Sequence, residues 1–173
     1  MRQPIELEHL VVKFHNLWAN QWLLLTCGDF EKKDYNAMTV GWGSLGTMWG
    51  RPFAQVVVRP QRYTFEFMNR YDTFTLCVFP LAYHKALNLL GTKSGRQTDK
   101  IKESGLTPIP SSTIAAPSFA EAELILECQK IYWQDMDPSH FMAPYIAKLY
   151  NQDYHRIYFG EIKAAFGEDQ YRT

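Results

Sequence analysis

The chain has 173 residues, of which 46% are hydrophobic and 15% aromatic. This length suits one domain, and the apolar content is enough to build a core, which excludes intrinsic disorder as a description of the whole chain. Eighteen basic residues balance eighteen acidic residues, so the formal net charge is zero. This balance argues against general nucleic-acid binding, which needs a basic excess, and it removes one barrier to self-association.

The sequence has no stretch typical of a membrane span or a secretory signal. Its long charge-free stretches, 35–50 and 105–120, are rich in glycine, threonine, serine or proline. The N-terminal stretch 1–15 carries acidic residues where a signal peptide needs an apolar segment. We therefore expect a soluble cytoplasmic protein that does not contact a membrane.

The cysteines and histidines form no recognisable metal or disulfide pattern. Cys27, Cys77 and Cys128 are spaced about fifty residues apart, which predicts buried free thiols. The five histidines fall into no spacing that is typical of a metal site. We therefore predict no metal.

Four short runs rich in leucine, β-branched and aromatic residues predict strands in the first half of the chain. These runs are 22–27, 37–40, 53–58 and 73–78. Polar residues at 28–34 predict a turn, and a link containing glycine and proline is expected at 46–52. Together they predict a meander of antiparallel strands.

Short helices are expected after these strands. One is predicted from Thr64, as its cap, to Arg70, and another over 83–90, closed by Gly91. A third begins at Ser94 or Thr98 and ends at Gly105. Three prolines in the stretch 106–118 predict an extended crossing over the surface.

Two long strands are predicted near the C-terminus, at 123–132 and 155–163. Between them Asp137 and Pro138 can start a helical insertion over 137–153, which Pro144 would interrupt. Six or more strands without regular βαβ alternation favour a mainly β protein, an antiparallel barrel in one domain over 1–173.

Two catalytic motifs are matched only superficially. Gly41 to Gly46 fits the glycine pattern of a dinucleotide-binding turn, but Gly50 and Pro52 leave no room for the long helix that should follow. Ser44 lacks the glycine two residues before it that a nucleophile elbow requires. Neither a Rossmann fold nor a hydrolase triad is supported.

Three other stretches can serve structure or ligand binding. The uncharged stretch 36–46 is either a barrel strand that bends with Trp42 in the core, or a backbone surface for a planar ligand. The stretches 59–64 and 94–100 each place basic residues at a helix start, which suits a phosphate but is also common in capped surface helices.

Six short motifs, which follow one another along the chain, together indicate a family resemblance. They are NAMTVGW at 36–42, RPQRYT at 59–64, SGRQTDK at 94–100, GLTP at 105–108, LEC at 126–128 and HRIYFGEI at 155–162. Over about residues 22 to 162 the chain resembles the flavin reductase-like family of FMN-binding split β-barrels, in particular its flavoredoxin-type branch. The resemblance implies an antiparallel, Greek-key-like split β-barrel with short peripheral helices. It also implies a homodimer with FMN near the subunit interface, FAD being the alternative cofactor.

The same resemblance implies which residues bind the flavin. Expected along the isoalloxazine ring and ribityl chain are Met38, Thr39, Val40 and Trp42. Expected at the ring edge or phosphate arm are Arg59, Tyr63 and Thr64, and at the phosphate Ser94, Arg96 and Lys100. His155 matches a family histidine that faces the flavin or the nicotinamide, although a histidine at a strand edge can also lack any chemical role.

The insertion at 137–153 departs from the family pattern, since relatives have a shorter turn there. The leading hypothesis is an FMN-containing oxidoreductase that takes hydride from NAD(P)H and passes electrons to free flavin, ferric complexes or a partner protein. The alternatives are a flavin-binding electron carrier or sensor without NAD(P)H activity, and a barrel that has lost its cofactor. The residues do not distinguish NADH from NADPH, and they do not identify the acceptor.

Overall fold

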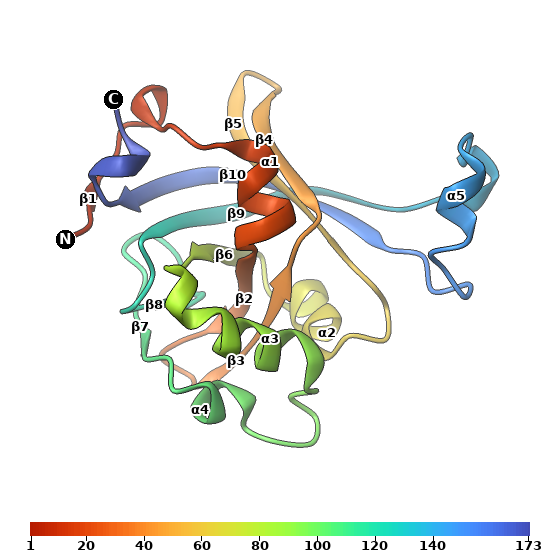
Figure 1. The fold of residues 1–173 in the computed structure, drawn as a ribbon, viewed down its shortest axis with the longest axis horizontal. Coiled ribbons are helices and arrows are strands. Elements are labelled where there is room, and N and C mark those ends of the chain that lie inside the picture. Colours follow the sequence, from red (N-terminus) through yellow and green to blue (C-terminus); the bar gives the residue numbers. More distant parts are fainter.

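The computed structural model describes residues 1–173, and most of its strands join one antiparallel sheet (Figure 1). These strands are β1 (Gln3–Pro4), β2 (Leu23–Asp29), β3 (Asp34–Val40), β4 (Gly43–Met48), β5 (Arg51–Val58), β6 (Thr73–Val78), β9 (Leu124–Asp135) and β10 (Arg156–Gly167). Their order is β3-β2-β6-β9-β10-β5-β4, with β1 beside β10. The predicted mainly β, antiparallel class is confirmed.

The connection between β3 and β4 closes this sheet. The two strands lie at opposite ends of the strand order, yet only Gly41 and Trp42 separate them in the chain. Three residue steps span at most about 10 Å, so the two edges must lie close together. The sheet therefore curls into a barrel that is split along one seam, and Gly41 and Trp42 lie at one end of that seam.

Short helices surround the barrel. The α-helices are α1 (Phe14–Asn16), α2 (Tyr63–Arg70), α3 (His84–Thr92), α4 (Lys100–Ser104) and α5 (Pro144–Ala147). The 3₁₀ turns are η1 (Leu7–His9), η3 (Leu81–Tyr83), η4 (Pro138–His140) and η5 (Asp169–Tyr171), and η2 (Leu17–Gln21) is a π-helical turn. None of these helices has the length and apolar composition needed to cross a bilayer.

The core has two parts, one on each face of the sheet. Leu23 and Leu25 of β2 point into the larger cluster within the barrel, which also receives Phe67 and Met68 from α2. Leu24 points to the other face and joins the smaller cluster under α3 and α4. Because β2 is buried on both faces, its sequence is a continuous apolar run rather than an alternating one.

The three cysteines lie in this core as free thiols, as predicted. Burial raises the pKa of Cys27 and of Cys77 to about 12. These thiols are therefore protonated and unreactive at neutral pH.

The predicted strands of the first half are confirmed, and β6 has the predicted bounds. The link expected at 46–52 is wrong, because β4 continues to Met48 and β5 already begins at Arg51. Trp49 and Gly50 form a two-residue hairpin turn with φ of 53° and 70°. Positive φ at both central residues is the geometry that lets so short a loop join two twisted strands.

The predicted helices exist, but their ends differ. α2 begins at Tyr63, so Thr64 lies inside the helix and does not cap it. The cap of α4 is Asp99, whose carboxylate accepts a hydrogen bond from Lys102 N, and not Ser94 or Thr98. α3 continues through Gly91 to Thr92, so that glycine does not close it.

Two expectations about prolines are also corrected. The stretch 106–118 does not simply cross the surface, because it contains strand β7 (Pro108–Ile109) and leads into strand β8 (Ser118–Phe119), whose two residues are buried. Pro144 starts α5 and does not interrupt a helix, because a first-turn residue needs no N–H. Residues 136–154, here called the arm, connect β9 to β10 and project from the barrel (Figure 1).

Glu127 of β9 holds the 110–117 loop against the sheet. Its buried carboxylate accepts hydrogen bonds from the backbone N–H groups of Ser112 and Thr113 at 2.7 and 2.8 Å. The hydroxyls of the same two residues donate to it as well, at distances of 2.6 to 3.2 Å. A buried carboxylate is stable only with such donors, so this loop and this side chain depend on each other.

We predict that Glu127→Gln destabilises the fold by about 2 kcal/mol, because the NH₂ group of glutamine cannot accept the hydrogen bonds that Ser112 and Thr113 donate to the carboxylate. For a chain of this length the expected loss in Tm is about 4 to 8 °C, measured by calorimetry. The exposed Glu31→Gln serves as the control and should leave Tm unchanged. Equal Tm values for the two variants would show that the loop does not depend on Glu127.

Candidate functional site: a cleft at the barrel seam

A cavity of about 210 Å³ lies where the seam meets the end of β3. It is lined by Met38, Thr39, Val40, Gly41, Trp42, Val57, Arg59, Arg62 and His155. β3 supplies one wall, while the end of β5 and the start of β10 supply the other. We call it the seam cavity.

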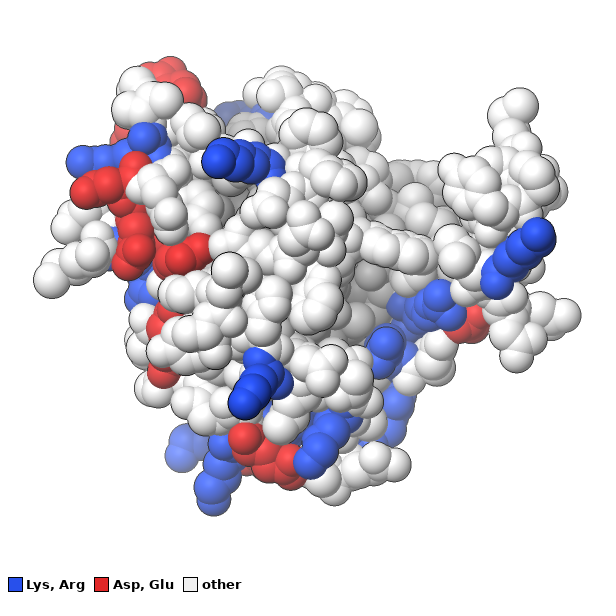
Figure 2. Space-filling view, in the orientation of Figure 1, with Lys and Arg blue, Asp and Glu red and all other residues white.

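A second cavity, of about 290 Å³, adjoins the first. It is lined by Met38, Gln61, Arg62, Tyr63, Thr64, Thr92, Lys93, Ser94 and Lys100, and we call it the lysine cavity. Met38 and Arg62 line both cavities, so together they form one cleft. In Figure 2 basic side chains gather below the arm.

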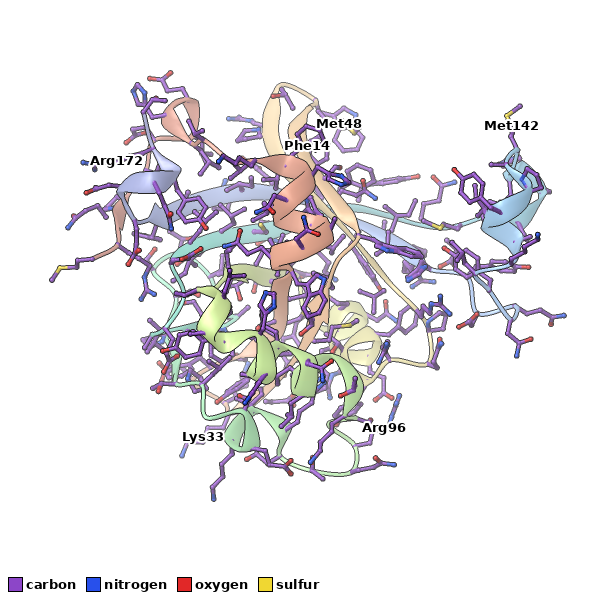
Figure 3. All side chains as sticks on the ribbon, viewed as in Figure 1. Phe14, Lys33, Met48, Arg96, Met142 and Arg172 are labelled. Atoms are coloured by element: carbon purple, nitrogen blue, oxygen red, sulfur yellow. The ribbon has the colours of Figure 1, made fainter.

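The cleft brings together every predicted site residue except Arg96. Met38, Thr39, Val40, Trp42, Arg59 and His155 line the seam cavity, while Tyr63, Thr64, Ser94 and Lys100 line the lysine cavity. Arg96 is exposed on the surface of the neighbouring loop (Figure 3). It pairs with Glu66, donates to Gln61 O at 3.1 Å and lies 4.9 Å from the centre of the Tyr63 ring.

Lys100 is a buried cation without an acidic partner. Its ammonium donates to the carbonyl oxygens of Leu90 and Lys93 at 2.8 and 3.1 Å. Burial and the nearby positive charge of Arg62 lower the pKa of Lys100 to about 8. An anion in the lysine cavity would offset both effects, because it would stabilise the charged ammonium.

Arg62 and Thr64 add further donors. Arg62 donates through Nη1 to Gly91 O at 2.9 Å and forms no ion pair with a carboxylate. The buried Thr64 accepts a hydrogen bond from Asn36 Nδ2 at 2.7 Å, which leaves its own hydroxyl hydrogen free. The lysine cavity is therefore surrounded by donors and positive charge, which is the environment that a phosphate needs.

Trp42, the aromatic residue of the uncharged stretch 36–46, lies at the surface. Trp42 is 46% exposed, so the interpretation that places it in the core is wrong. Its ring centroid lies 5.2 Å from that of His155, at an interplanar angle of 50°. In the same cavity the Thr39 hydroxyl already donates to Leu87 O at 2.5 Å, which anchors α3 to β3.

His155 is 8% exposed, and a residue of the arm holds its ring in place. The hydroxyl of Tyr150 lies 2.9 Å from its Nδ1. Burial and the nearby Arg59 guanidinium lower the pKa of His155 to about 4. The imidazole is therefore neutral at physiological pH.

Arg59 ties the arm to the rim of the seam cavity. Its Nη1 lies 2.6 Å from Asp153 Oδ2, and its Nη2 donates to Leu149 O at 2.9 Å. Hydrogen bonds from Asn151 N and from Arg59 hold the pKa of Asp153 well below its usual range. Arg59 thus lines the cleft, but its charge is already paired.

Several lining residues were not predicted. Arg62 is not among the residues that the resemblance implies, although it is one of the basic residues of the stretch 59–64 that suit a phosphate. Gly41 lies between two residues that were named, whereas Val57, Thr92 and Lys93 belong to no recognised motif. They reach the cleft through the packing of α3 and β5, which the local sequence does not reveal.

The fold and the cleft define a split β-barrel of the flavin reductase-like class. The model of the flavin reductase-like domain matches residues 17–172, so the chain belongs to this family.

Solved structures show the same fold. An FMN-binding flavin reductase-like protein from Shewanella baltica OS155 superposes with a TM-score of 0.71 at 18% identity, over 98% of this chain and 78% of that one. A flavoredoxin from Methanosarcina acetivorans gives 0.67 at 24% identity, over 88% and 71% of the two chains. At these identities the similarity establishes the fold.

Among curated proteins, an uncharacterized protein of Pyrococcus abyssi is 29% identical over 99 residues. The match covers 57% of this chain and 56% of that relative. The chain thus aligns with little more than half of the relative's length.

We predict that His155 makes the fold sensitive to acid. Its pKa is about 4 in the folded chain and 6.5 when unperturbed, so the unfolded chain binds more protons between these values. Stability should therefore fall as the pH drops from about 6.5 to 4. In His155→Gln this loss should be smaller by about 1 to 2 kcal/mol, measured by urea unfolding at about pH 7 and about pH 4.5.

The exposed His140→Gln is the matched control and should keep the acid sensitivity of the wild type. If His155→Gln keeps it too, the ring of His155 is not held neutral by the fold.

Proposed function

We propose that the cleft binds FMN, and that the protein is an oxidoreductase taking hydride from NAD(P)H to this flavin and passing electrons to free flavin, ferric complexes or a partner protein. One observation carries the proposal. Lys100 lies at one end of a cleft whose other end holds Trp42 and His155, Arg62 lines both parts of it, and neither cation has a carboxylate partner. Such a cleft suits a ligand with a phosphate at one end and a planar ring at the other.

The donor set fits the phosphate arm of FMN. Lys100 and Arg62 supply charge, and the free hydroxyl hydrogen of Thr64 supplies a hydrogen bond. Ser94 Oγ accepts from Arg96 N at 3.3 Å, so its hydrogen is also available. Charge-assisted hydrogen bonds of this kind are the strong ones in phosphate recognition.

The other end fits a flavin ring. Trp42 offers an exposed aromatic surface, and the neutral His155 brings hydrogen-bonding capacity without charge. When bound, the flavin would supply hydride acceptance and electron transfer. The residues of the chain would bind and orient it, and no nucleophile or acid-base pair is required.

A second candidate is a flavin-binding electron carrier or sensor without NAD(P)H activity. The anchored arm favours it, because Arg59 and Asp153 hold the arm at the rim of a seam cavity of only about 210 Å³. A fixed arm at this place would limit access of a nicotinamide to the flavin ring.

We further propose that the protein is a homodimer. Trp49 in the turn between β4 and β5 and Tyr132 on β9 are exposed, and their rings lie 6.0 Å apart. The ring of Phe159 on β10 lies beside both, at 6.4 and 5.8 Å. A cluster of large exposed aromatic side chains is typical of a protein interface. This surface is the part of the molecule that we expect a second copy to cover.

The test of the function is an absorbance spectrum before and after addition of FMN, followed by anaerobic NADH and NADPH on the same sample. We expect flavin bands that bleach with one or both nucleotides. Bands that stay oxidised would support the carrier, and a protein that takes up no FMN would contradict both candidates.

We predict that Lys100→Ala raises the dissociation constant of FMN at least about tenfold, since a charge-assisted hydrogen bond contributes about 1.5 to 3 kcal/mol. Titration of FMN by fluorescence quenching measures it. Lys102→Ala removes an exposed lysine from the same helix and is the control. Trp42→Ala should also weaken binding, and unchanged affinity in both Lys100→Ala and Trp42→Ala would refute the assignment of the site.

A further inference from the structure

The arm is anchored to the barrel at its inner end. At its outer end Met142 is 96% and Tyr145 68% exposed, and Figure 3 shows Met142 at the tip. At the inner end the rings of Phe141, Tyr150 and Tyr154 pack together, with centroids 5.2 to 5.8 Å apart. The inner part of the arm is therefore a packed aromatic cluster beside the cleft.

Tyr150 is the residue through which the arm reaches the cleft. Its hydroxyl lies 2.9 Å from Nδ1 of His155. The guanidinium of Arg59 lies over its ring, 5.0 Å from the centroid, and Arg59 also binds the arm through Asp153 and Leu149 O. Cation and ion-pair contacts thus fix the position of the Tyr150 ring, and with it the position of the hydroxyl.

This hydroxyl has one hydrogen and two acceptors within reach. They are His155 Nδ1 at 2.9 Å and the thioether sulfur of Met136 at 3.5 Å. A thioether is a weak acceptor, whereas an imidazole nitrogen is a strong one, so the hydroxyl donates to Nδ1. Because the imidazole is neutral, its single hydrogen must then lie on Nε2.

The other ring nitrogen is available to a ligand. Nε2 of His155 makes no hydrogen bond with the protein, and it is not among the buried polar atoms that lack a partner. The His155 side chain lines the seam cavity beside Trp42. The ring can therefore offer an N–H donor to a group bound in this cavity.

We propose that Tyr150 is a positioning residue, which fixes His155 in the Nε2–H tautomer and so presents a hydrogen-bond donor to the flavin ring in the seam cavity. The identity of the ligand rests on the proposed function above. The effect of Tyr150 on His155 does not, because it follows from contacts within the chain.

The first experiment records the ¹⁵N chemical shifts of the histidine rings in the full chain, with His155→Gln used to assign the His155 signals. We expect the wild type to show the Nε2–H tautomer alone and Tyr150→Phe to show a mixture of tautomers. Tyr154→Phe is the matched control, because it removes a hydroxyl without a hydrogen-bond partner from the same cluster, and it should match the wild type.

A wild type in the Nδ1–H form, or a Tyr150→Phe variant with unchanged shifts, would overturn the proposal. The wild-type spectrum alone already tests the tautomer, so the result does not depend on the folding of a variant.

The second experiment measures FMN affinity in a double-mutant cycle. Tyr150→Phe should raise the dissociation constant about fivefold in the wild-type background, which corresponds to one hydrogen bond. In the His155→Ala background the same substitution should have no effect, because Tyr150 acts through His155. Equal losses in both backgrounds would show a merely structural role and overturn the proposal.

The two experiments separate the two claims. If the tautomer is fixed as expected but no FMN binds, the proposed function fails while the contact between Tyr150 and His155 stands. If FMN binds but the tautomer is not fixed, the positioning role fails and the proposed function stands.

Discussion

The two-residue connection between β3 and β4 is the constraint on which the rest of the structure depends. It forces opposite edges of the sheet together, which makes the barrel and leaves its seam. The tolerance at this place is small, because a Cβ on Gly43 would collide with the carbonyl oxygen of Gln55 and with the indole of Trp18. Since Gly41 and Trp42 of this connection also line the seam cavity, the contact that closes the barrel forms part of the cleft as well.

The cleft places positive charge where backbone carbonyl oxygens accept its hydrogen bonds but no carboxylate neutralises it. A buried lysine without a carboxylate costs stability, and the lowered pKa of Lys100 expresses that cost. By contrast, the buried Glu127 is surrounded by donors from its own loop. Glu127 thus has its charge fully compensated within the fold, whereas Lys100 does not, and this difference is the physical basis for our proposal of an anion beside Lys100.

The arm connects the cleft to a part of the chain that departs from the family pattern. Arg59 was expected to contact the flavin, yet its charge is paired with Asp153, so in this protein it serves as an anchor as well as a lining residue. Through that anchor Tyr150 reaches His155. A segment that the sequence marks only as an insertion thereby sets the hydrogen bonding of the histidine that the family resemblance singled out.

The sequence by itself determined the strands whose patterns are local, such as β2 and β6, and through its motifs it determined most of the cleft. It missed β4, because a strand of small residues paired at a barrel edge lacks the usual β-branched pattern. Only the tertiary structure decided that Trp42 is exposed, that Arg96 turns away to Glu66 and that Tyr150 contacts His155. These outcomes depend on which distant segments meet, and side-chain pairing across such distances is fixed by packing rather than by any local pattern.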